Sequence, residues 1–222
     1  MNIISYSQKF LIEVNEELLY NRRMEKNIRE PKQERSIQKK EAIVKAAYSV
    51  FSDVGYYNTN TADIAKKANV STGIVYSYFK DKRDILFYVI KIYIEDVTKP
   101  IEAFIDNLVA PVDIHTLSSN AIDLAIKLHQ KNANLHNILH SLADTQEDIN
   151  EEFMELESHV TKIFTDKLFE LGINNSDLTE KVHIAMNLVQ SFAHEYLYDK
   201  HEYIDYEAMK ANVLKCLIAL FD

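Results

Sequence analysis

Residues 60–79 read NTADIAKKANVSTGIVYSYF, and their pattern is the strongest indication of the fold in this part of the chain. Asn60, with Asp63 three residues later, is a variant of the capping box that begins a helix. Asn69 tolerates the left-handed conformation that ends a helix, and Ser71 is a favoured N-cap for another. The stretch therefore predicts two short helices joined by a tight turn.

Small and apolar residues lie where these two helices must meet. Ala65 permits close approach, Val70 is expected to be a buried plug in the turn, and Val75 and Phe79 point inward at helical spacing. Gly73 lets another backbone or a phosphate come close. These features are typical of a helix-turn-helix, whose second helix presents its N-terminus to base edges of DNA. A plain helical hairpin is the alternative, and the basic residues on both sides of the stretch argue against it.

The rest of the chain is also expected to be helical, which makes the fold class all-α. Only 3 glycines and 3 prolines occur in 222 residues, too few for the turns of a sandwich, a barrel or a doubly wound sheet. A first helix over 36–54 ends before Gly55, and an almost wholly apolar helix over 82–98 follows the helix-turn-helix as a buried connector. With Pro100 and Pro111 as breaks, further helices are predicted over 101–109, 113–130, 132–143, 147–171, 177–199 and 206–221.

The net charge of −9 conceals a division along the chain. Residues 22–84 contain 14 Lys or Arg and 8 Asp or Glu, a net of +6, whereas residues 85–222 contain 10 and 23, a net of −13. A basic segment joined to an acidic one indicates a nucleic-acid partner for the basic part. We interpret residues 1–34 as an N-terminal extension, basic from about residue 22. That basic part is either an arm in the minor groove or a solvated charge run.

Several classes of protein are disfavoured by what the sequence lacks. Cys216 is the single cysteine, so no internal disulfide forms, which fits a cytoplasmic location. We find no signal peptide and no apolar stretch that suits a membrane. Gly-rich phosphate loops and nucleophile motifs are missing, so the chain is not expected to be an enzyme or to carry a cofactor. His129, His136 and His140 share helical spacing, but without a His-Glu-x-x-His pattern we predict no metal site.

Many spaced residues between 36 and 86 resemble the N-terminal domain of the TetR (tetracycline-repressor-like) family of transcriptional regulators. They are Ala46, Ala47, Phe51, Gly55, Tyr56, Thr59, Ile64, Ala65, Ala68, Asn69, Val70, Ser71, Gly73, Val75, Tyr76, Tyr78, Phe79, Lys82 and Leu86. The resemblance implies a helix-turn-helix domain over 35–81 and a helical ligand-binding and dimerisation domain over 82–222. It also implies a homodimer on a palindromic operator in double-stranded DNA.

Roles in DNA binding follow from the same resemblance. Thr72, Gly73 and Ile74 stand where family members touch base edges, and Ser71 caps that helix. Phosphate contacts are implied for Thr59, Thr61, Tyr76, Tyr78 and Lys82. The predicted second helix holds no Arg, Lys, Asn or Gln, so specificity is expected from the Thr72 hydroxyl, from Ile74 against thymine methyl groups and from DNA shape.

The acidic part is expected to bind an unidentified small, largely apolar ligand that releases a repressor from its operator. Candidate pocket residues are the aromatic side chains Phe87, Tyr93, Phe104, Phe153 and Phe164. Candidate dimer residues form stripes on the last two helices: Val182, Met186, Val189, Phe192, Tyr196, Met209, Val213, Leu217 and Leu220. Two alternatives stay open: an architectural or division-linked DNA binder without a ligand, and an interaction protein with a vestigial helix-turn-helix.

Overall fold

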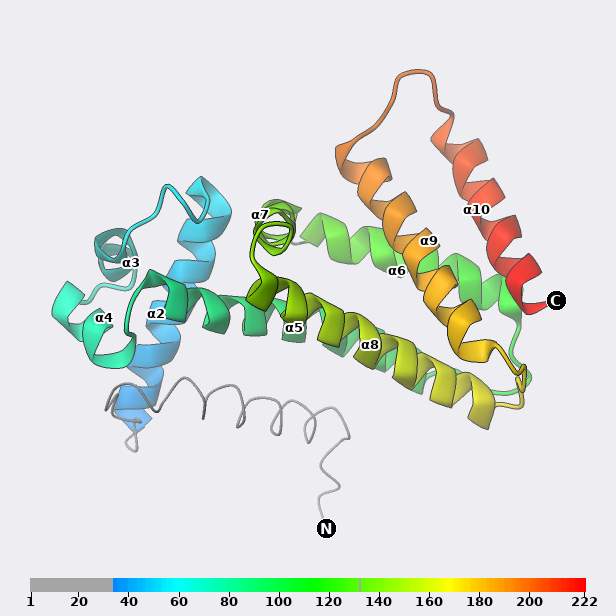
Figure 1. Cartoon of the computed structure of the whole chain (residues 1–222), viewed down its shortest axis with the longest axis horizontal. Coiled ribbons are helices and arrows are strands. Elements are labelled where there is room, and N and C mark those ends of the chain that lie inside the picture. The colour runs from blue at the N-terminus through cyan, green and yellow to red at the C-terminus, as the bar shows by residue number, and fades with distance from the viewer. Residues whose placement is uncertain (1–33, 132) are drawn as a thin grey trace, which may run out of the picture. The chain divides into compact units, whose positions relative to one another are not determined.

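The computed structural model describes residues 34–131 and 133–222, which are almost entirely helical and contain no strand (Figure 1). The expected all-α fold is confirmed. The predicted N-terminal extension lies outside the described residues except for Glu34. The helices are α2 (Glu34–Val54), α3 (Thr61–Lys67), α4 (Thr72–Tyr78), α5 (Lys82–Asp106), α6 (Ile114–Lys131), α7 (Ala133–Ala143), α8 (Glu147–Glu170), α9 (Leu178–Tyr198) and α10 (Tyr206–Phe221).

The described residues form two compact units. The first comprises residues 34–50 and 57–89, and the second comprises residues 51–56 and 90–222. The sequence suggested a boundary at residue 82, ahead of α5. The two units instead divide inside α5, between residues 89 and 90. In the first unit the apolar faces of α2, α3, α4 and the start of α5 supply the core. Its fully buried side chains are Ile43, Ala47, Ile64, Val75, Phe79, Ile85, Leu86 and Val89.

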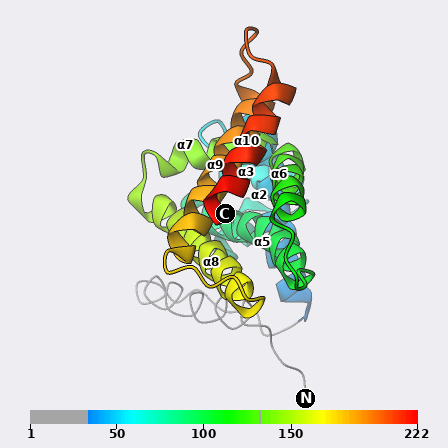
Figure 2. The ribbon, with the colours of Figure 1, turned by 90° about the vertical axis from the view of Figure 1, so that its right-hand side faces the viewer.

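The second unit is built on α6, α9 and α10, which contact one another (Figure 2). Their shared core cluster consists of Ile122, Val189, Phe192, Val213 and Leu217. A second cluster joins α6, α8 and α9 through Leu117, Leu168, Leu178 and Val182. Among the helices described, none is long and apolar enough to cross a membrane.

One predicted break is wrong: α5 continues through Pro100 to Asp106, where separate helices over 82–98 and 101–109 were expected. A proline inside a helix removes one backbone hydrogen bond and costs about 3 kcal/mol. Burial on both sides of it offsets that cost, because Tyr93 and Ile105 are 4% and 3% exposed. Tertiary packing has here overridden a local helix breaker.

The central residues of the predicted dimer stripes are buried within the single chain. Val182, Val189, Phe192, Val213 and Leu217 are each at most 8% exposed. The other four predicted residues pack against the same clusters: Met186, Tyr196, Met209 and Leu220. These apolar faces form the core between α6, α8, α9 and α10, so they pack mainly within the single chain.

Candidate functional site

The turn between α3 and α4 has the local geometry that its sequence predicts. Asn60 accepts hydrogen bonds from the backbone of residues 62 and 63, while the Asp63 carboxylate accepts one from the Asn60 amide, which completes the capping box. Asn69 adopts φ 54°, the left-handed conformation expected of it. The Val70 amide donates to the Ala65 carbonyl at 3.0 Å, and this bond closes the turn.

Helix α4 is fixed from its inner side. The Val75 and Phe79 side chains are fully buried, as predicted. The Phe79 ring meets Tyr88 edge to face at 5.4 Å, and the Lys40 ammonium lies 4.1 Å from the centre of the Tyr88 ring. Val70 is half-buried rather than fully buried, so it seals the turn less completely than the sequence suggested. Because its inner face is packed, α4 presents its other face in a fixed orientation.

The outward face of α4 carries most of the predicted DNA-binding residues. Ser71 caps the helix, and Thr72 and Gly73 are exposed at its first turn, with Ile74 half-buried beside them. Tyr76 is 56% exposed, and its hydroxyl lies 2.9 Å from the Thr61 hydroxyl at the start of α3. The structure therefore brings two predicted phosphate contacts from different helices to one point.

Tyr78 is less accessible than Tyr76. It is half-buried, and its hydroxyl lies 2.8 Å from the Ser36 hydroxyl near the start of α2. That hydrogen bond joins α4 to the first helix of the same unit. A phosphate reaching Tyr78 would share its hydroxyl with Ser36.

Thr59 and Lys82 differ from the other predicted phosphate contacts. The Thr59 residue is only 3% exposed, which places its side chain in the interior rather than on an accessible surface. The Lys82 ammonium donates to the Thr59 carbonyl at 2.7 Å, and partial burial lowers the pKa of Lys82. This bond joins the start of α5 to the loop before α3, so Lys82 also has a structural role that the sequence did not reveal.

No internal contact of the fold requires a glycine at position 73. A Cβ atom added there would meet only the Ser71 hydroxyl oxygen, at 3.9 Å, which is ordinary van der Waals contact. The residue lies within α4, where glycine is less favourable than alanine by about 1 kcal/mol. Packing within the described part of the chain therefore does not explain why position 73 holds a glycine.

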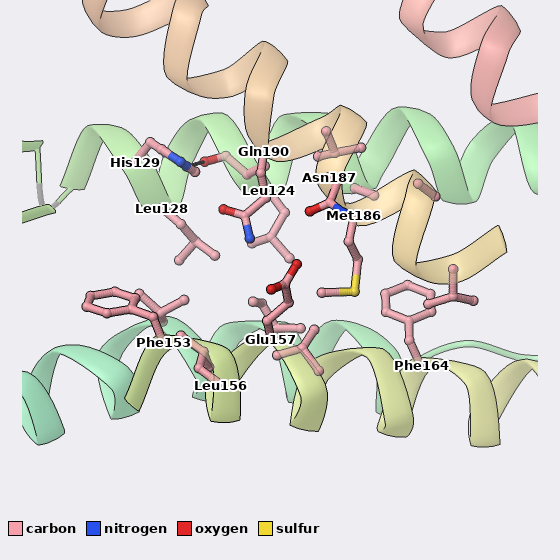
Figure 3. Close-up of a pocket in the computed structure, with 18 of the residues that line it drawn as sticks. Leu124, Leu128, His129, Phe153, Leu156, Glu157, Phe164, Met186, Asn187 and Gln190 are labelled. Atoms are coloured by element: carbon pink, nitrogen blue, oxygen red, sulfur yellow. Dashed lines mark hydrogen bonds between the residues drawn. The ribbon is translucent and has the colours of Figure 1, made fainter. Parts of the chain in front are cut away.

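The second unit contains a cavity of about 440 Å³, a volume typical of small-molecule sites. Helices α5, α6, α8 and α9 supply most of its walls, which are largely apolar (Figure 3). Four of the five predicted aromatic residues line it: Tyr93, Phe104, Phe153 and Phe164. In Figure 3, His129 and Phe164 lie toward opposite ends of the drawn region, with Leu124 and Glu157 between them.

Phe87, the fifth predicted aromatic residue, does not line this cavity. It belongs to the first unit, where the Arg83 guanidinium lies 5.7 Å from the centre of its ring. The cavity face of α5 carries residues 93, 97, 101 and 104, at helical spacing. Phe87 precedes Tyr93 by six positions, which is not a whole number of turns, so it leaves the helix in another direction.

The helical spacing of His129, His136 and His140 was noted in the sequence, but these residues were not predicted to line the cavity. All three line the cavity, with ring centroids 4.5 Å apart for His129 and His136 and 4.2 Å apart for His136 and His140. The Tyr93 hydroxyl lies 2.7 Å from His136 Nδ1. Burial, followed by the neighbouring imidazoles, lowers the pKa of His136 to about 2, and that of His140 is also lowered. Within residues 34–131 and 133–222, no group of three His, Cys, Asp or Glu is arranged to hold a metal ion.

Comparisons with known proteins agree with this architecture. Residues 43–89 match the family of bacterial regulatory proteins called the tetR family. The HTH-type transcriptional regulator HbdR of Aromatoleum sp. (strain CIB) is 41% identical over 76 residues, which are 34% of this chain and 33% of that protein. The chain thus aligns with about a third of HbdR. The fatty acid metabolism regulator protein of Bacillus subtilis (strain 168) is 25% identical over 151 residues, covering 65% of this chain and 73% of that protein.

Solved structures extend the likeness to the second unit. The transcriptional regulator FadR from Bacillus subtilis, in complex with stearoyl-CoA, superposes with a TM-score of 0.60 at 23% identity, over 81% of this chain and 97% of that one. The fatty acid degradation regulator FadR from Bacillus halodurans gives a TM-score of 0.59 at 16% identity, over 85% and 96%. The shared fold defines a class of helical proteins with an N-terminal helix-turn-helix. Residues 43–89 of the chain are the helix-turn-helix domain of the tetR family of bacterial regulatory proteins.

Proposed function

We propose that this chain is a sequence-specific DNA-binding repressor that acts as a homodimer on a palindromic operator and is released by a ligand in the cavity. The observation that carries the proposal is the first turn of α4. The helix is packed from within by Val75 and, at its C-terminal end, by Phe79, and its first turn holds Thr72 and Gly73 exposed. A rigid helix end with small residues is what readout of base edges in the major groove requires.

The contact roles divide by chemistry. Thr72, Gly73 and Ile74 face the bases, because they form the N-terminal turn of α4. The hydroxyl pair of Thr61 and Tyr76 donates to a phosphate at one side of that turn. Tyr78 and Lys82 contribute further phosphate contacts, which are restrained by their bonds to Ser36 and Thr59. Thr59 does not contact the DNA directly in this proposal. Its carbonyl accepts a hydrogen bond from the Lys82 ammonium and so holds Lys82 in position.

A homodimer follows from the size of this contact. One short helix reads few base pairs, and a second copy about 34–36 Å away doubles the contact and selects a palindrome. Since the predicted stripes form the core of the chain, we reassign the dimer surface to the exposed faces of α9 and α10. Ile184 is 51% exposed on α9, and exposed small residues on α10 permit close approach: Ala208, Ala211 and Ala219.

The ligand is proposed to be elongated and largely apolar. Apolar side chains from six helices, α5 to α10, line the cavity, which argues against a DNA binder of the same fold that needs no ligand. The two fatty acid regulators of Bacillus subtilis and Bacillus halodurans share the fold, and the former was solved with stearoyl-CoA. A molecule with a long acyl chain is therefore the first class to test.

The direct test is a mobility-shift titration of the full chain with DNA from upstream of its own gene. We expect a specific shift that survives competition by unrelated DNA and that footprints as two half-sites one helical turn apart. Addition of a long-chain acyl compound is expected to reverse the shift. Binding that is equal for all DNA sequences would contradict sequence-specific recognition, whereas a specific shift indifferent to every acyl compound would contradict only the ligand class.

Replacement of Ile74 by alanine is expected to change sequence preference. The half-buried side chain of Ile74 faces bases in our assignment, so the loss of affinity falls on sites with a thymine methyl group at the contacted position.

Lys82→Ala is expected to weaken binding to all sequences alike, because a phosphate contact carries no sequence information. Selection of binding sites from a random library measures both. Thermal melting of Lys82→Ala separates the lost Thr59 bond from lost contact with DNA. Identical preferences for the two variants would refute the assignment.

Replacement of Gly73 by alanine is expected to act in opposite directions on stability and on DNA binding. Alanine is favoured in a helix and finds space here, so the free energy of unfolding should rise by about 0.5–1 kcal/mol. The added methyl group points at the DNA, so affinity should fall at least tenfold. Chemical denaturation and the mobility shift measure the two effects. Retained affinity would show that no partner approaches this position closely.

A further inference from the structure

One end of the cavity is lined by the imidazole rings of three histidines, and a fourth lies beside them. His129 and His136 are 8% and 4% exposed, and their centroids are 4.5 Å apart. His140 lies on the other side of His136, at 4.2 Å, and His194 follows at 5.8 Å. We refer to His129, His136, His140 and His194 as the histidine cluster. The buried members, His129 and His136, need hydrogen-bonding partners, since an unsatisfied buried nitrogen costs about 1–3 kcal/mol.

The protonation state of His129 is fixed by its neighbour. His129 Nδ1 lies 2.9 Å from the Ala125 carbonyl oxygen, which can only accept, so Nδ1 carries the proton. Burial lowers the pKa of His129, which keeps the ring neutral near pH 7 and leaves Nε2 as a lone-pair acceptor. The Tyr198 hydroxyl donates to the His129 carbonyl instead. Of the residues that the structure describes, none donates to His129 Nε2.

His136 offers the complementary group. Its Nδ1 lies 2.7 Å from the Tyr93 hydroxyl, and the phenol is the more acidic of the two, so it donates. His136 is neutral because burial and the adjacent imidazoles lower its pKa, and its remaining proton is therefore on Nε2. The cluster thus presents one acceptor, on His129, and one donor, on His136, at the same end of an apolar cavity.

We propose that the histidine cluster binds a terminal hydroxyl or carboxyl group of an otherwise apolar ligand, whose O–H donates to His129 Nε2 and whose oxygen accepts from His136 Nε2–H. An O–H group both donates and accepts, so it satisfies both nitrogens at once. An ester or thioester carbonyl can only accept and would leave His129 Nε2 unpaired. This inference rests on the proposed function of the cavity as a ligand site.

The charges around the cavity determine the form in which an acid binds. No Lys or Arg belongs to the part of the cavity wall that the structure describes, whereas Asp144 and Glu157 do. An ionised carboxylate would thus meet two acids and no fixed cation, so a fatty acid binds together with one proton. Tyr93 and Tyr198 are the other titratable groups beside the cluster, and within the cluster His194 Nδ1 lies 3.3 Å from Asp199.

Three probes of equal chain length separate these chemistries: lauric acid, dodecanol and methyl laurate. Calorimetric titration of the full chain is expected to show dodecanol binding at least tenfold more tightly than the ester, with no dependence on pH. Laurate should bind with uptake of about one proton, and its Kd should rise about tenfold per pH unit between pH 6.5 and 8, because a carboxyl group ionises near ~4.3. Proton uptake is measured by repeating the titration in buffers of different ionisation enthalpy.

The pH window is set by stability. The pKa of His136 in the folded chain, about 2, lies below its ordinary value of 6.5. The unfolded chain therefore binds a proton that the folded chain does not, and stability is lost progressively as pH falls below 6.5. Above that value, His136 no longer changes the stability of the apo protein with pH.

The variant His129→Phe removes the acceptor while keeping an aromatic ring, and His115→Phe is the matched control at an exposed position on the same helix. We expect His129→Phe to bind dodecanol and the ester equally, and His115→Phe to discriminate as the unaltered chain does. Equal binding of the ester and dodecanol by the unaltered chain, or laurate binding without proton uptake, would overturn the head-group inference and leave the proposed function standing. If no probe binds and none reverses the DNA shift, the apolar-ligand function itself fails.

Discussion

Replacing Phe192 with alanine is expected to lower the free energy of unfolding by about 3–5 kcal/mol, the usual range for a buried phenylalanine. Phe192 is 1% exposed and stacks on Tyr196 with ring centroids 5.7 Å apart. It lies in the cluster shared by α6, α9 and α10, so its loss leaves a void where three helices meet. Urea denaturation followed by circular dichroism measures the effect.

The same variant tests the corrected dimer surface. Ile184→Ala is the matched control, because Ile184 lies on α9 but is 51% exposed. We expect Ile184→Ala to change stability by less than about 1 kcal/mol at protein concentrations where the dimer has dissociated, and to weaken dimerisation in sedimentation experiments. A Phe192→Ala defect that disappears at low protein concentration would place Phe192 at the dimer surface, contrary to the structure.

The helix-turn-helix could be predicted closely from sequence because local interactions determine it. The Asn60 capping box, the left-handed Asn69 and the Ser71 cap each involve residues at most four positions apart, and all three occur in the structure. Apart from the expected break at Pro100, helix ends elsewhere were placed within a few residues for the same reason. The inward residues Val75 and Phe79 followed from helical spacing alone.

What could not be predicted depends on which surfaces meet in three dimensions. An apolar stripe on α9 is equally compatible with a core and with a dimer interface, and only α6, far away in sequence, decides for the core. Pro100 breaks an isolated helix, but long-range burial of its neighbours keeps α5 continuous. The hydrogen bond from Lys82 to the Thr59 carbonyl joins residues 23 positions apart, so no local sequence pattern could predict it. The histidine cluster likewise joins residues from three helices.

The charge division along the chain leads to the steepest expected effect on DNA binding. Between 50 and 200 mM salt, a protein with about 6–10 phosphate contacts loses about 10³–10⁵ in affinity through counterion release. The net charge of −9 does not weaken this expectation, because residues 22–84 alone contain 14 basic and 8 acidic side chains. The acidic second unit is expected to face away from the duplex, where salt screens its repulsion.

Two variants distinguish a charged phosphate contact, which contributes to the salt dependence, from a neutral one, which does not. Lys82→Ala removes one charge from each half-site, so the slope of log affinity against log salt should become shallower by about 0.9 per subunit, and twice that for a dimer. Tyr76→Phe removes a neutral phosphate donor, so affinity should fall while the slope stays constant. Lys127→Ala, an exposed charge on α6 away from the proposed DNA and dimer surfaces, is the control and should leave both unchanged. Fluorescence anisotropy over a salt series measures all three. If the unaltered chain lost less than tenfold affinity over this range, few phosphates could be in contact, and a role for Lys82 at the DNA backbone would be untenable.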